Sequence, residues 1–360
     1  MTVIAERLAA QLLSGRPARD PLTVTRRLLA VQGQDPRGAR LAIRARSTGL
    51  TAGDVDTALT EERSLLITWL NRGTLHLICS DDYGWLHALT TPPLLRGNAR
   101  RLEQEGVSPA AAERGVRTIE RALAADGPQT RAQLRARLDA ARVPTAGQAL
   151  VHVLMLTTLR GLTVRGPMVG REHAYALVAD WLGEPPPIER DRALAELARR
   201  YLAGHAPADD RDLARWAGLP LRDARAGLAA ISSELRERED GLLELAKRPR
   251  RTAASDAELP PPRLLGSFDP LLLGWCSREQ IVGPNKSLVT SNGLFRPFAL
   301  VHGRAVASWK LAGGKIVLKP FEKLTRVVTA ALDADAQAVL DYLAPAPVPR
   351  ARPRAGSGAD

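Results

Sequence analysis

The sequence predicts a mainly α-helical fold of the α+β class, with β-hairpin wings on three tandem winged-helix units and a β-rich C-terminal part. The main observation is a helix–turn–helix–strand pattern that begins near residue 130 and again near residue 209. An N-terminal set of helices followed by a hairpin makes a third copy, and most strand-like runs follow the last copy. We expect units at residues 1–126, 127–204 and 205–342, the last with a β-rich extension, and a disordered tail at 343–360.

The composition indicates a basic, intracellular protein. A length of 360 residues corresponds to about two to three domains, and the net charge of +12 favours a polyanionic partner. Only six of the 51 basic residues are lysine, and alanine is abundant, so the base composition of a GC-rich genome is an alternative source of part of the charge.

Several classes of protein are disfavoured. The two cysteines and six histidines show no metal-ligand spacing, so we expect neither a metal nor another cofactor. Glu6 and Arg7 interrupt the N-terminus, which argues against a signal peptide, and no apolar run of about 18 residues favours a membrane span. We expect a bacterial cytoplasmic, nucleoid-associated protein that does not bind membranes. Without a heptad pattern, a monomer is the simplest state.

The N-terminal unit combines helical periodicity with one β-hairpin. Leucine and isoleucine recur at helical spacing in its first segments, and the runs around Asn71-Arg72-Gly73 are rich in strand-forming residues with a glycine turn between them. The expected helices cover residues 3–13, 22–34, 51–61, 81–89, 91–105 and 108–126, and the hairpin covers residues 64–78.

The second and third units begin with residues that favour helix N-caps. Thr130 precedes a helix at 131–141, and Asp209-Asp210 precede one at 211–217. The second helices are expected at 146–159 and 221–236, with strands after each at 162–165 and 241–245. The helix at 146–159 is apolar on several sides, so His152 and Met155 are interpreted as buried packing residues.

The C-terminal part should be rich in strands. We expect a hairpin turn at His302-Gly303, a second turn at 312–314 and a closing helix at 323–342. The expected strands cover residues 264–265, 295–301, 305–311 and 316–318.

Three helix–turn–helix units on a basic chain predict binding to duplex DNA. Aromatic residues make up only 4% of the chain, which argues against a stacking platform for single strands. Each basic residue taken alone is more simply a solvated surface charge, and winged helices can also bind proteins. The candidate DNA contacts are Arg37, Arg40, Arg72, Arg131, Lys310, Lys315 and His76, the last either facing the DNA or hydrogen-bonded locally within its hairpin.

No carboxylate stands out as catalytic. Asp81-Asp82 and Asp209-Asp210 are interpreted as helix caps, and Asp269 as a turn or cap residue. Gln32 and Gln34 remain, at the end of the helix expected at 22–34 and just before Asp35-Pro36. A pair of amides could hold one water molecule, because each accepts and donates hydrogen bonds; a backbone cap or two exposed amides is the simpler alternative.

Four phrases in the same order resemble the AlkZ/YcaQ family of winged-helix DNA glycosylases, which unhook interstrand crosslinks. The resemblance spans residues 1–342. The phrases are VQGQDPRGAR at 31–40, LNRGTLHLI at 70–78, SFDPLLLGWCSRE at 267–279 and GLFRPFALVHGRAVASW at 293–309.

The resemblance implies three winged helices in a C shape around double-stranded DNA, with Gln32 and Gln34 as the catalytic residues of a Gln-aliphatic-Gln motif. Gly33 departs from the aliphatic middle position. The implied reaction is monofunctional hydrolysis of the N-glycosidic bond of N7-alkylguanine, including bulky adducts and crosslinks, by water that both glutamines orient. This branch implies self-resistance to a DNA-alkylating natural product. A non-enzymatic tandem winged-helix transcription regulator is the alternative, and it would not need the glutamine pair.

Overall fold

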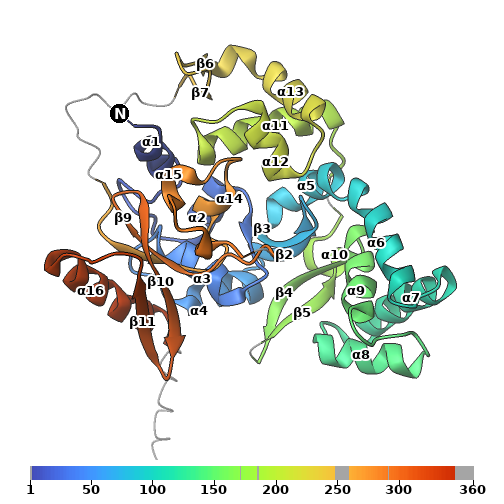
Figure 1. Ribbon diagram of the computed structural model, residues 1–360. Helices are drawn as coiled ribbons and strands as arrows, with labels where there is room; N and C mark the ends of the chain where they lie inside the picture. The colour runs from blue at the N-terminus through green and yellow to red at the C-terminus, as the bar shows by residue number, and fades with distance from the viewer. Residues whose placement is uncertain (1, 171, 185, 248–258, 291, 345–360) are drawn as a thin grey trace, which may run out of the picture.

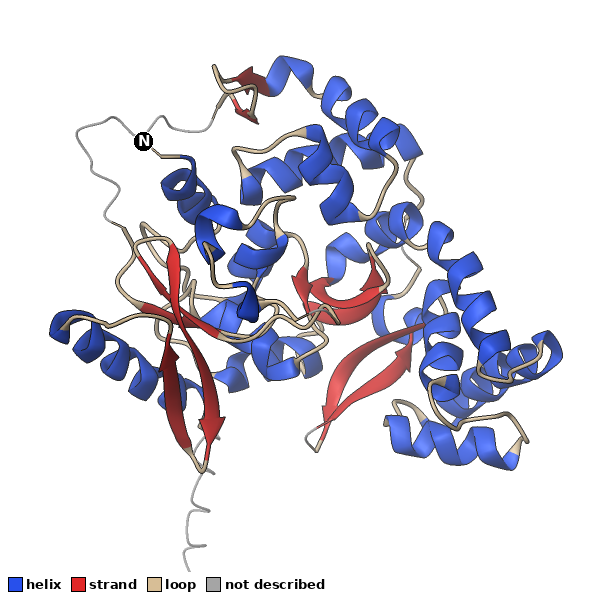
Figure 2. Cartoon of the chain, in the orientation of Figure 1, coloured by secondary structure: helices blue, strands red, loops and turns tan. Residues whose placement is uncertain are grey.

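A computed structural model describes residues 2–170, 172–184, 186–247, 259–290 and 292–344. Helices predominate, and the strands form antiparallel hairpins, which confirms the predicted α+β class (Figures 1 and 2). The predicted tail lies outside the described residues from residue 345 on, as does most of the basic loop expected after residue 247. The elements follow an arc from α16 (Arg326–Leu343) across α11 (Arg190–His205) to α8 (Arg131–Ala140) (Figure 1).

The N-terminal part differs from the expected pattern around residue 30. The second helix, α2, ends at Leu28, because Leu29 adopts a positive φ of 64°, and residues 31–32 then form a short strand. A helix that was not expected begins at Pro36. The elements up to residue 126 are α1 (Val3–Ala10), α2 (Pro21–Leu28), β1 (Val31–Gln32), α3 (Pro36–Arg44), α4 (Ala52–Thr60), β2 (Leu65–Leu70), β3 (Thr74–Cys79), η1 (Ser80–Asp82), α5 (Tyr83–Thr90), α6 (Pro92–Gln104) and α7 (Pro109–Asp126).

The next helix pair and hairpin join the first hairpin in one sheet. The five strands are ordered β1-β3-β2-β4-β5, so β2 lies between its own partner and a strand from residues 163–169. Thr130 caps α8 as predicted, with a capping box to Gln133. The elements are α8, α9 (Ala149–Leu159), β4 (Thr163–Val169), β5 (Glu172–Leu177), α10 (Val178–Leu182) and α11.

Helix α9 belongs to the protein core. Nine of its 11 residues are buried, as its uniform apolarity predicted. Met155 is buried, but His152 is only half-buried and its Nδ1 lies 2.8 Å from the Asn98 side-chain oxygen, so the prediction that His152 is a buried packing residue is wrong. Because most of α9 is covered, it offers little surface for a recognition face in a DNA groove.

The following helix pair is shorter than expected at its end. Asp209 caps α12 through a capping box with Asp212, and Gly218 ends the helix in a left-handed conformation. The neighbouring Asp210 instead pairs with Arg225. The elements are α12 (Asp210–Ala217), α13 (Leu221–Ala230), η2 (Ser232–Glu234), β6 (Leu235–Glu237) and β7 (Leu243–Leu245).

The C-terminal part forms a four-stranded sheet in the order β11-β10-β9-β8, with α16 packed against it. The hairpin turn at His302-Gly303 is confirmed. Asp269 caps α14, as predicted, and its fully buried carboxylate also pairs with the buried Arg46. The elements are β8 (Arg263–Leu265), α14 (Pro270–Leu273), α15 (Glu279–Val282), η3 (Lys286–Leu288), β9 (Phe298–Val301), β10 (Arg304–Ala312), β11 (Lys315–Pro320) and α16.

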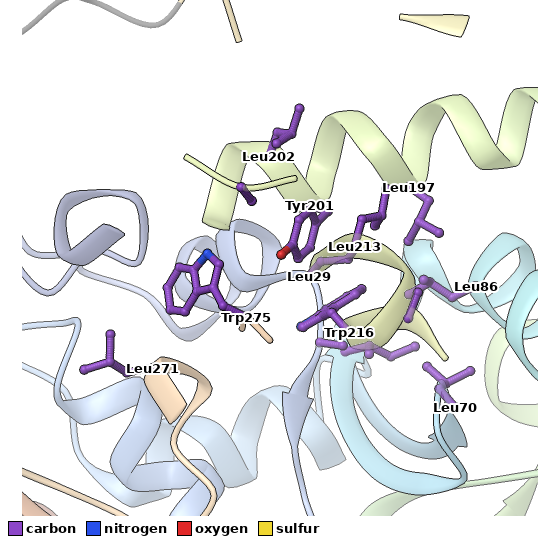
Figure 3. Packing of buried hydrophobic residues seen from close by; sticks show 14 of the residues in the cluster. Leu29, Leu70, Leu86, Leu197, Tyr201, Leu202, Leu213, Trp216, Leu271 and Trp275 are labelled. Carbon is purple, nitrogen blue, oxygen red and sulfur yellow. The ribbon is translucent and has the colours of Figure 1, made fainter. Parts of the chain in front are cut away.

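The largest hydrophobic cluster joins segments from both halves of the chain. Leu29, Leu70 and Trp216 lie in it beside Tyr201 of α11 (Figure 3). The hydroxyl of Tyr201 donates to the carbonyl oxygen of Gly274, at 2.8 Å. Packing around this cluster therefore holds β2, α12 and the loop after α14 against one another. Because β2 belongs to the same sheet as β1, this packing also supports the strand that ends at Gln32.

Candidate active site

The two glutamines lie between a sheet strand and a helix start. Gln32 is on β1 and only 6% exposed, whereas Gln34 is exposed in the turn before α3. The side-chain nitrogen of Gln32 lies 2.5 Å from the side-chain oxygen of Gln34 and donates to it. The structure thus brings the predicted pair into direct contact, but the position at a helix end expected from the sequence is wrong: Gln32 ends strand β1, and Gln34 precedes α3.

Local sequence explains this geometry. The backbone N–H of Gly33 donates to the carbonyl oxygen of Leu75, at 2.7 Å, which continues the pairing of β1 with β3. Asp35 is extended, as expected before proline, and its carboxylate accepts from the N–H of Arg37 to cap α3. Pro36 occupies the first helical position, where no N–H is needed. The Asp-Pro pair therefore starts a helix here.

Gly33 leaves room for a small side chain. A Cβ atom added there would lie 3.5 Å from the nitrogen of Leu77 and 3.6 Å from the Cγ2 of Ile67, which are ordinary contact distances. Its φ is not in the left-handed region. The departure of Gly33 from an aliphatic residue therefore removes some packing without a conformational requirement for glycine.

A polar row crosses three strands beside the pair. Gln32 is opposite His76 in the β1–β3 register, and His76 is opposite Thr68 in the β2–β3 register. Side chains at such paired positions share one face of a sheet. Both His76 and Thr68 are buried. Gln32 therefore extends from the edge of a buried polar row.

His76 is neutral in this row. Its Nδ1 lies 2.9 Å from the carbonyl oxygen of Thr74, which can only accept, so Nδ1 carries the proton. Burial and the nearby charge of Arg72 lower the pKa of His76 to about 3, against the opposing effect of the Thr74 hydrogen bond. His76 is hydrogen-bonded locally, the second of the two alternatives weighed from the sequence, and its buried ring leaves it little surface to offer DNA.

The amide pair retains an oxygen and a nitrogen for a ligand. Because Gln32 donates to the oxygen of Gln34, the oxygen of Gln32 and the N–H groups of Gln34 remain available. One acceptor and one donor on neighbouring side chains can orient a water molecule without a charged base.

Arg40, expected among the DNA contacts, is buried in an ionic network. It is 8% exposed and its guanidinium donates to Asp56 on α4 and to the carbonyl of Pro36. Its Nη2 also lies 3.2 Å from Nε2 of His173 on β5. These contacts occupy the guanidinium, so Arg40 is not on an open surface and we leave it out of the DNA-contact set. The exposed Arg37, three residues earlier, has no such ties among the described residues.

Arg72 lies at the tip of the β2–β3 hairpin, as predicted, and is partly tethered. Its Nη1 donates to the carbonyl oxygens of Arg215 and Trp216 at the end of α12, at 3.0 and 2.6 Å. The residue still presents exposed surface. It therefore fixes the hairpin to α12 while keeping other donors free.

The remaining candidates lie on two elements at opposite sides of the arc. Arg131 is exposed at the first position of α8, and the exposed Lys310 and Lys315 belong to the β10–β11 hairpin at the other side of the arc (Figure 1). In the hairpin register, Lys310 is opposite Val317 and Ser308 is opposite Lys319. Three lysines therefore share one face, and the alternation in KIVLK could have revealed Lys319 from the sequence.

Other polar groups near the site serve the fold. Asp82 begins α5 but makes no cap hydrogen bond; its carboxylate instead accepts from Arg200 of α11, at 2.8 and 2.9 Å.

Within the described ranges no group of three or more metal-ligating side chains occurs. No helix in the described part of the chain is long and apolar enough to cross a bilayer.

Comparisons with known proteins all find DNA glycosylases. A family model described as "DNA glycosylase AlkZ-like" matches residues 25–342. An interstrand DNA cross-link repair glycosylase of Streptomyces sahachiroi is 28% identical, over 93% of this chain and 94% of that protein. The solved structure of the Streptomyces sahachiroi DNA glycosylase AlkZ superposes with a TM-score of 0.76 at 26% identity, covering 94% of this chain and 95% of that one.

Proposed function

The chain belongs to the AlkZ-like DNA glycosylase family, and from that premise we propose that it hydrolyses the N-glycosidic bond of N7-alkylguanine in duplex DNA. The observation that carries the proposal is the direct contact between the amides of Gln32 and Gln34. The pair lies where a strand passes into the first turn of α3, beside a neutral histidine. No strong base is present in this arrangement, so the substrate must supply much of the driving force.

N7-alkylguanine meets that condition. Alkylation at N7 places a positive charge on the base, which can then leave without prior protonation. The sugar develops oxocarbenium character as the bond breaks, and water must attack C1′ from a fixed position. We propose that the side-chain oxygen of Gln32 accepts a hydrogen bond from the attacking water and that its partial negative charge stabilises the developing positive charge, while the proton released after attack passes to solvent. The N–H groups of Gln34 hold the water oxygen or the DNA next to it.

The substrate class extends to bulky adducts and interstrand crosslinks. The Streptomyces sahachiroi relative is named for cross-link repair and matches almost the whole chain. An N7-linked crosslink joins one guanine on each strand, and each of these guanines is an N7-alkylated leaving group. One mechanism therefore serves simple and bulky lesions. We propose self-resistance to a DNA-alkylating natural product as the biological role.

The DNA contacts are proposed from exposed basic residues. Lys310, Lys315 and Lys319 share one face of the β10–β11 hairpin, with the exposed Val317 between them. Arg37, Arg72 and Arg131 add contacts from the first turn of α3, the β2–β3 tip and α8. Such contacts bind phosphates without reading sequence, as a lesion-specific enzyme requires.

The rate at which single glutamine variants excise an alkylated base tests the proposal. Gln32→Ala and Gln34→Ala should each slow single-turnover release of 7-methylguanine at least about 100-fold, the loss typical of removing one positioned transition-state group. DNA affinity should stay within about twofold, because phosphate contacts dominate it. Release is measured as alkali-labile abasic sites. Wild-type rates in both variants would exclude the pair from the chemistry.

The family match does not favour the alternative of a transcription regulator. A regulator would bind an N7-alkylated duplex and leave it intact, with preference for one operator sequence. The same abasic-site assay on the wild-type protein therefore separates the two functions.

A further inference from the structure

Three arginines from distant parts of the chain gather at the tip of the β2–β3 hairpin, where it meets the end of α12. Arg72 lies in the β2–β3 turn, Arg215 near the end of α12 and Arg278 just before α15. The two hydrogen bonds of Arg72 to the end of α12 hold the turn against that helix. Close backbone packing reinforces the contact, because a Cβ on Gly218 would lie 2.9 Å from the carbonyl carbon of Asn71.

The three charges are not neutralised within the protein. In the described part of the chain, none of the three forms an ion pair with an Asp or Glu side chain. Burial, then the charges of Arg215 and Arg278, lower the pKa of Arg72, and burial and Arg215 lower the pKa of Arg278. Gathering like charges without a counter-charge is unfavourable for folding alone, and such conflicts are typical of binding sites.

The free donors of this cluster suit a phosphate. Arg215 is exposed with no partner among the described residues, and Arg72 has used only its Nη1. Arg278 is held in place because its Nε donates to the carbonyl of Leu272, at 2.7 Å, and its guanidinium lies 5.1 Å from the centre of the Phe295 ring. Its terminal nitrogens donate to no group in the described ranges. Planar guanidinium groups bind phosphate oxygens in pairs, which a lysine cannot do.

Arg72 also prepares the end of α12 for an anion. The carbonyl groups at a helix C-terminus carry partial negative charge and repel phosphate. Two of those carbonyls, of Arg215 and Trp216, instead accept from Arg72. This pairing neutralises the helix end, so that the outward side chain of Arg215 can hold an anion there.

The cluster and the glutamine pair are connected through the β2–β3 hairpin. Arg72 is near enough to His76 for its charge to affect that buried ring, and His76 is directly opposite Gln32 in the sheet. We propose that Arg72, Arg215 and Arg278 together bind one phosphate of the lesion-bearing DNA strand, next to the nucleotide whose base is removed. The proposal rests on the proposed function, since it takes DNA as the ligand.

A charge-by-charge test uses duplexes with a single 7-methylguanine. Each phosphate flanking the lesion is replaced in turn by a neutral methylphosphonate, and the protein concentration for half-maximal binding is measured. With wild-type protein, one replacement should weaken binding several-fold. With Arg215→Ala the same replacement should weaken binding clearly less than it does with wild-type protein, because one of the three charges that hold this phosphate is already gone. Arg278→Ala should show the same reduced effect of the methylphosphonate. In the control variant Arg121→Ala, on the exposed side of α7, the methylphosphonate should weaken binding as much as it does with wild-type protein.

This experiment distinguishes failure of the phosphate site from failure of the proposed glycosylase activity. If every methylphosphonate weakens the Arg215→Ala and Arg278→Ala proteins as much as wild type, the phosphate site is wrong. Binding decides this point whether or not the base is released. A wild-type protein that binds with this coupling but releases no 7-methylguanine would overturn the glycosylase proposal alone. Both variants must retain the wild-type melting temperature, which the exposure of Arg215 favours.

Discussion

The Nη2 of Arg40 lies 3.2 Å from the Nε2 of His173, so the first helix after the glutamine pair is joined directly to the β4–β5 hairpin. An arginine can only donate, and the histidine nitrogen therefore accepts in its neutral form. The backbone oxygen of Arg40 also accepts from the hydroxyl of Tyr342 on α16, at 2.9 Å. One residue of α3 thus contacts elements from the middle and the end of the chain.

Removing the Arg40 side chain should affect stability and excision together. Arg40→Ala leaves Asp56 and the Pro36 carbonyl without their donor, and we expect a loss of about 1–3 kcal/mol in the free energy of unfolding. Excision should slow because the turn that holds Gln34 loses its support. Urea denaturation and single-turnover assays measure the two effects. Arg37→Ala, on the exposed side of the same helix, should retain stability and weaken only DNA binding.

The two glutamines should differ in their tolerance of a carboxylate. Gln34→Glu keeps an oxygen that accepts from the nitrogen of Gln32, so the pair survives and partial excision activity is expected. Gln32→Glu removes that donor and places a carboxylate against the Gln34 oxygen, which should abolish most activity. Excision of 7-methylguanine at saturating protein gives the comparison. Equal losses in the two variants would contradict the assigned hydrogen-bond direction.

Two glycines near the site should respond differently to alanine. Gly33→Ala places its Cβ at ordinary contact distances and should change stability by less than about 1 kcal/mol. Gly38→Ala on α3 would put a Cβ 2.5 Å from the carbonyl oxygen of Ser267, so the backbone must shift. We expect about 1–3 kcal/mol of destabilisation, typical of overpacking. Thermal melting of both variants, with excision as a second measurement, tests the pair.

The buried ion pair between Arg46 and Asp269 should be essential for folding. Both side chains are fully buried, and the guanidinium donates to the two carboxylate oxygens at 2.8 and 2.9 Å. Asp269→Asn leaves an arginine charge uncompensated, which costs about 3–5 kcal/mol. Denaturant unfolding at neutral pH measures the loss. A variant with wild-type stability would show that Arg46 finds another partner.

Acid should destabilise the protein through three buried histidines. Burial is the largest cause that lowers the pKa values of His76, His173 and His205 to about 3, from an unfolded value near 6.5. Above pH 6.5 these residues are neutral in both states and contribute no pH dependence. As the pH falls from 6.5 towards 3, the unfolded chain takes up protons that the folded protein excludes. Each histidine then removes up to about 1.4 kcal/mol of stability per pH unit.

The measurement is the free energy of urea unfolding between pH 7.5 and pH 5. His173→Gln should flatten the slope, since it removes one of the histidines whose pKa is lowered by burial. A wild-type slope of zero over this range would show that these side chains are protonated in the folded state.

Local signals in the sequence were sufficient for some elements and misleading for others. Thr130 and Asp209 identified helix starts because a capping residue acts on its own neighbours. The end of α2 was misplaced because the positive φ of Leu29 is imposed by pairing of β1 with a strand more than 40 residues away. From the sequence, Asp35-Pro36 only follows the helix expected at 22–34, although the same two residues cap and start α3.

The glutamine pair could be predicted from the sequence. The side chains that surround it could not. Gln32 and Gln34 are two residues apart, so their contact is nearly guaranteed. The burial of Arg40 depends on Asp56 and His173, which are 16 and 133 residues away, and no periodic pattern reveals such partners. Arg215 and Arg278 were missed for the same reason, because only the folded chain brings them to Arg72.

The shared five-stranded sheet limits how the protein can be divided. Strand β2 is protected on one side by β3 and on the other by β4, so a fragment ending at residue 126 would expose its second edge. That edge is flat and apolar, with leucine, isoleucine and tryptophan in LLITWL, and unprotected edges of this kind pair with other chains. We expect such a fragment to aggregate, whereas a nick in the Gly183–Pro187 linker, beyond β5, would leave all five strands paired. Proteolysis sites that yield soluble complementary pieces should therefore lie after the fifth strand.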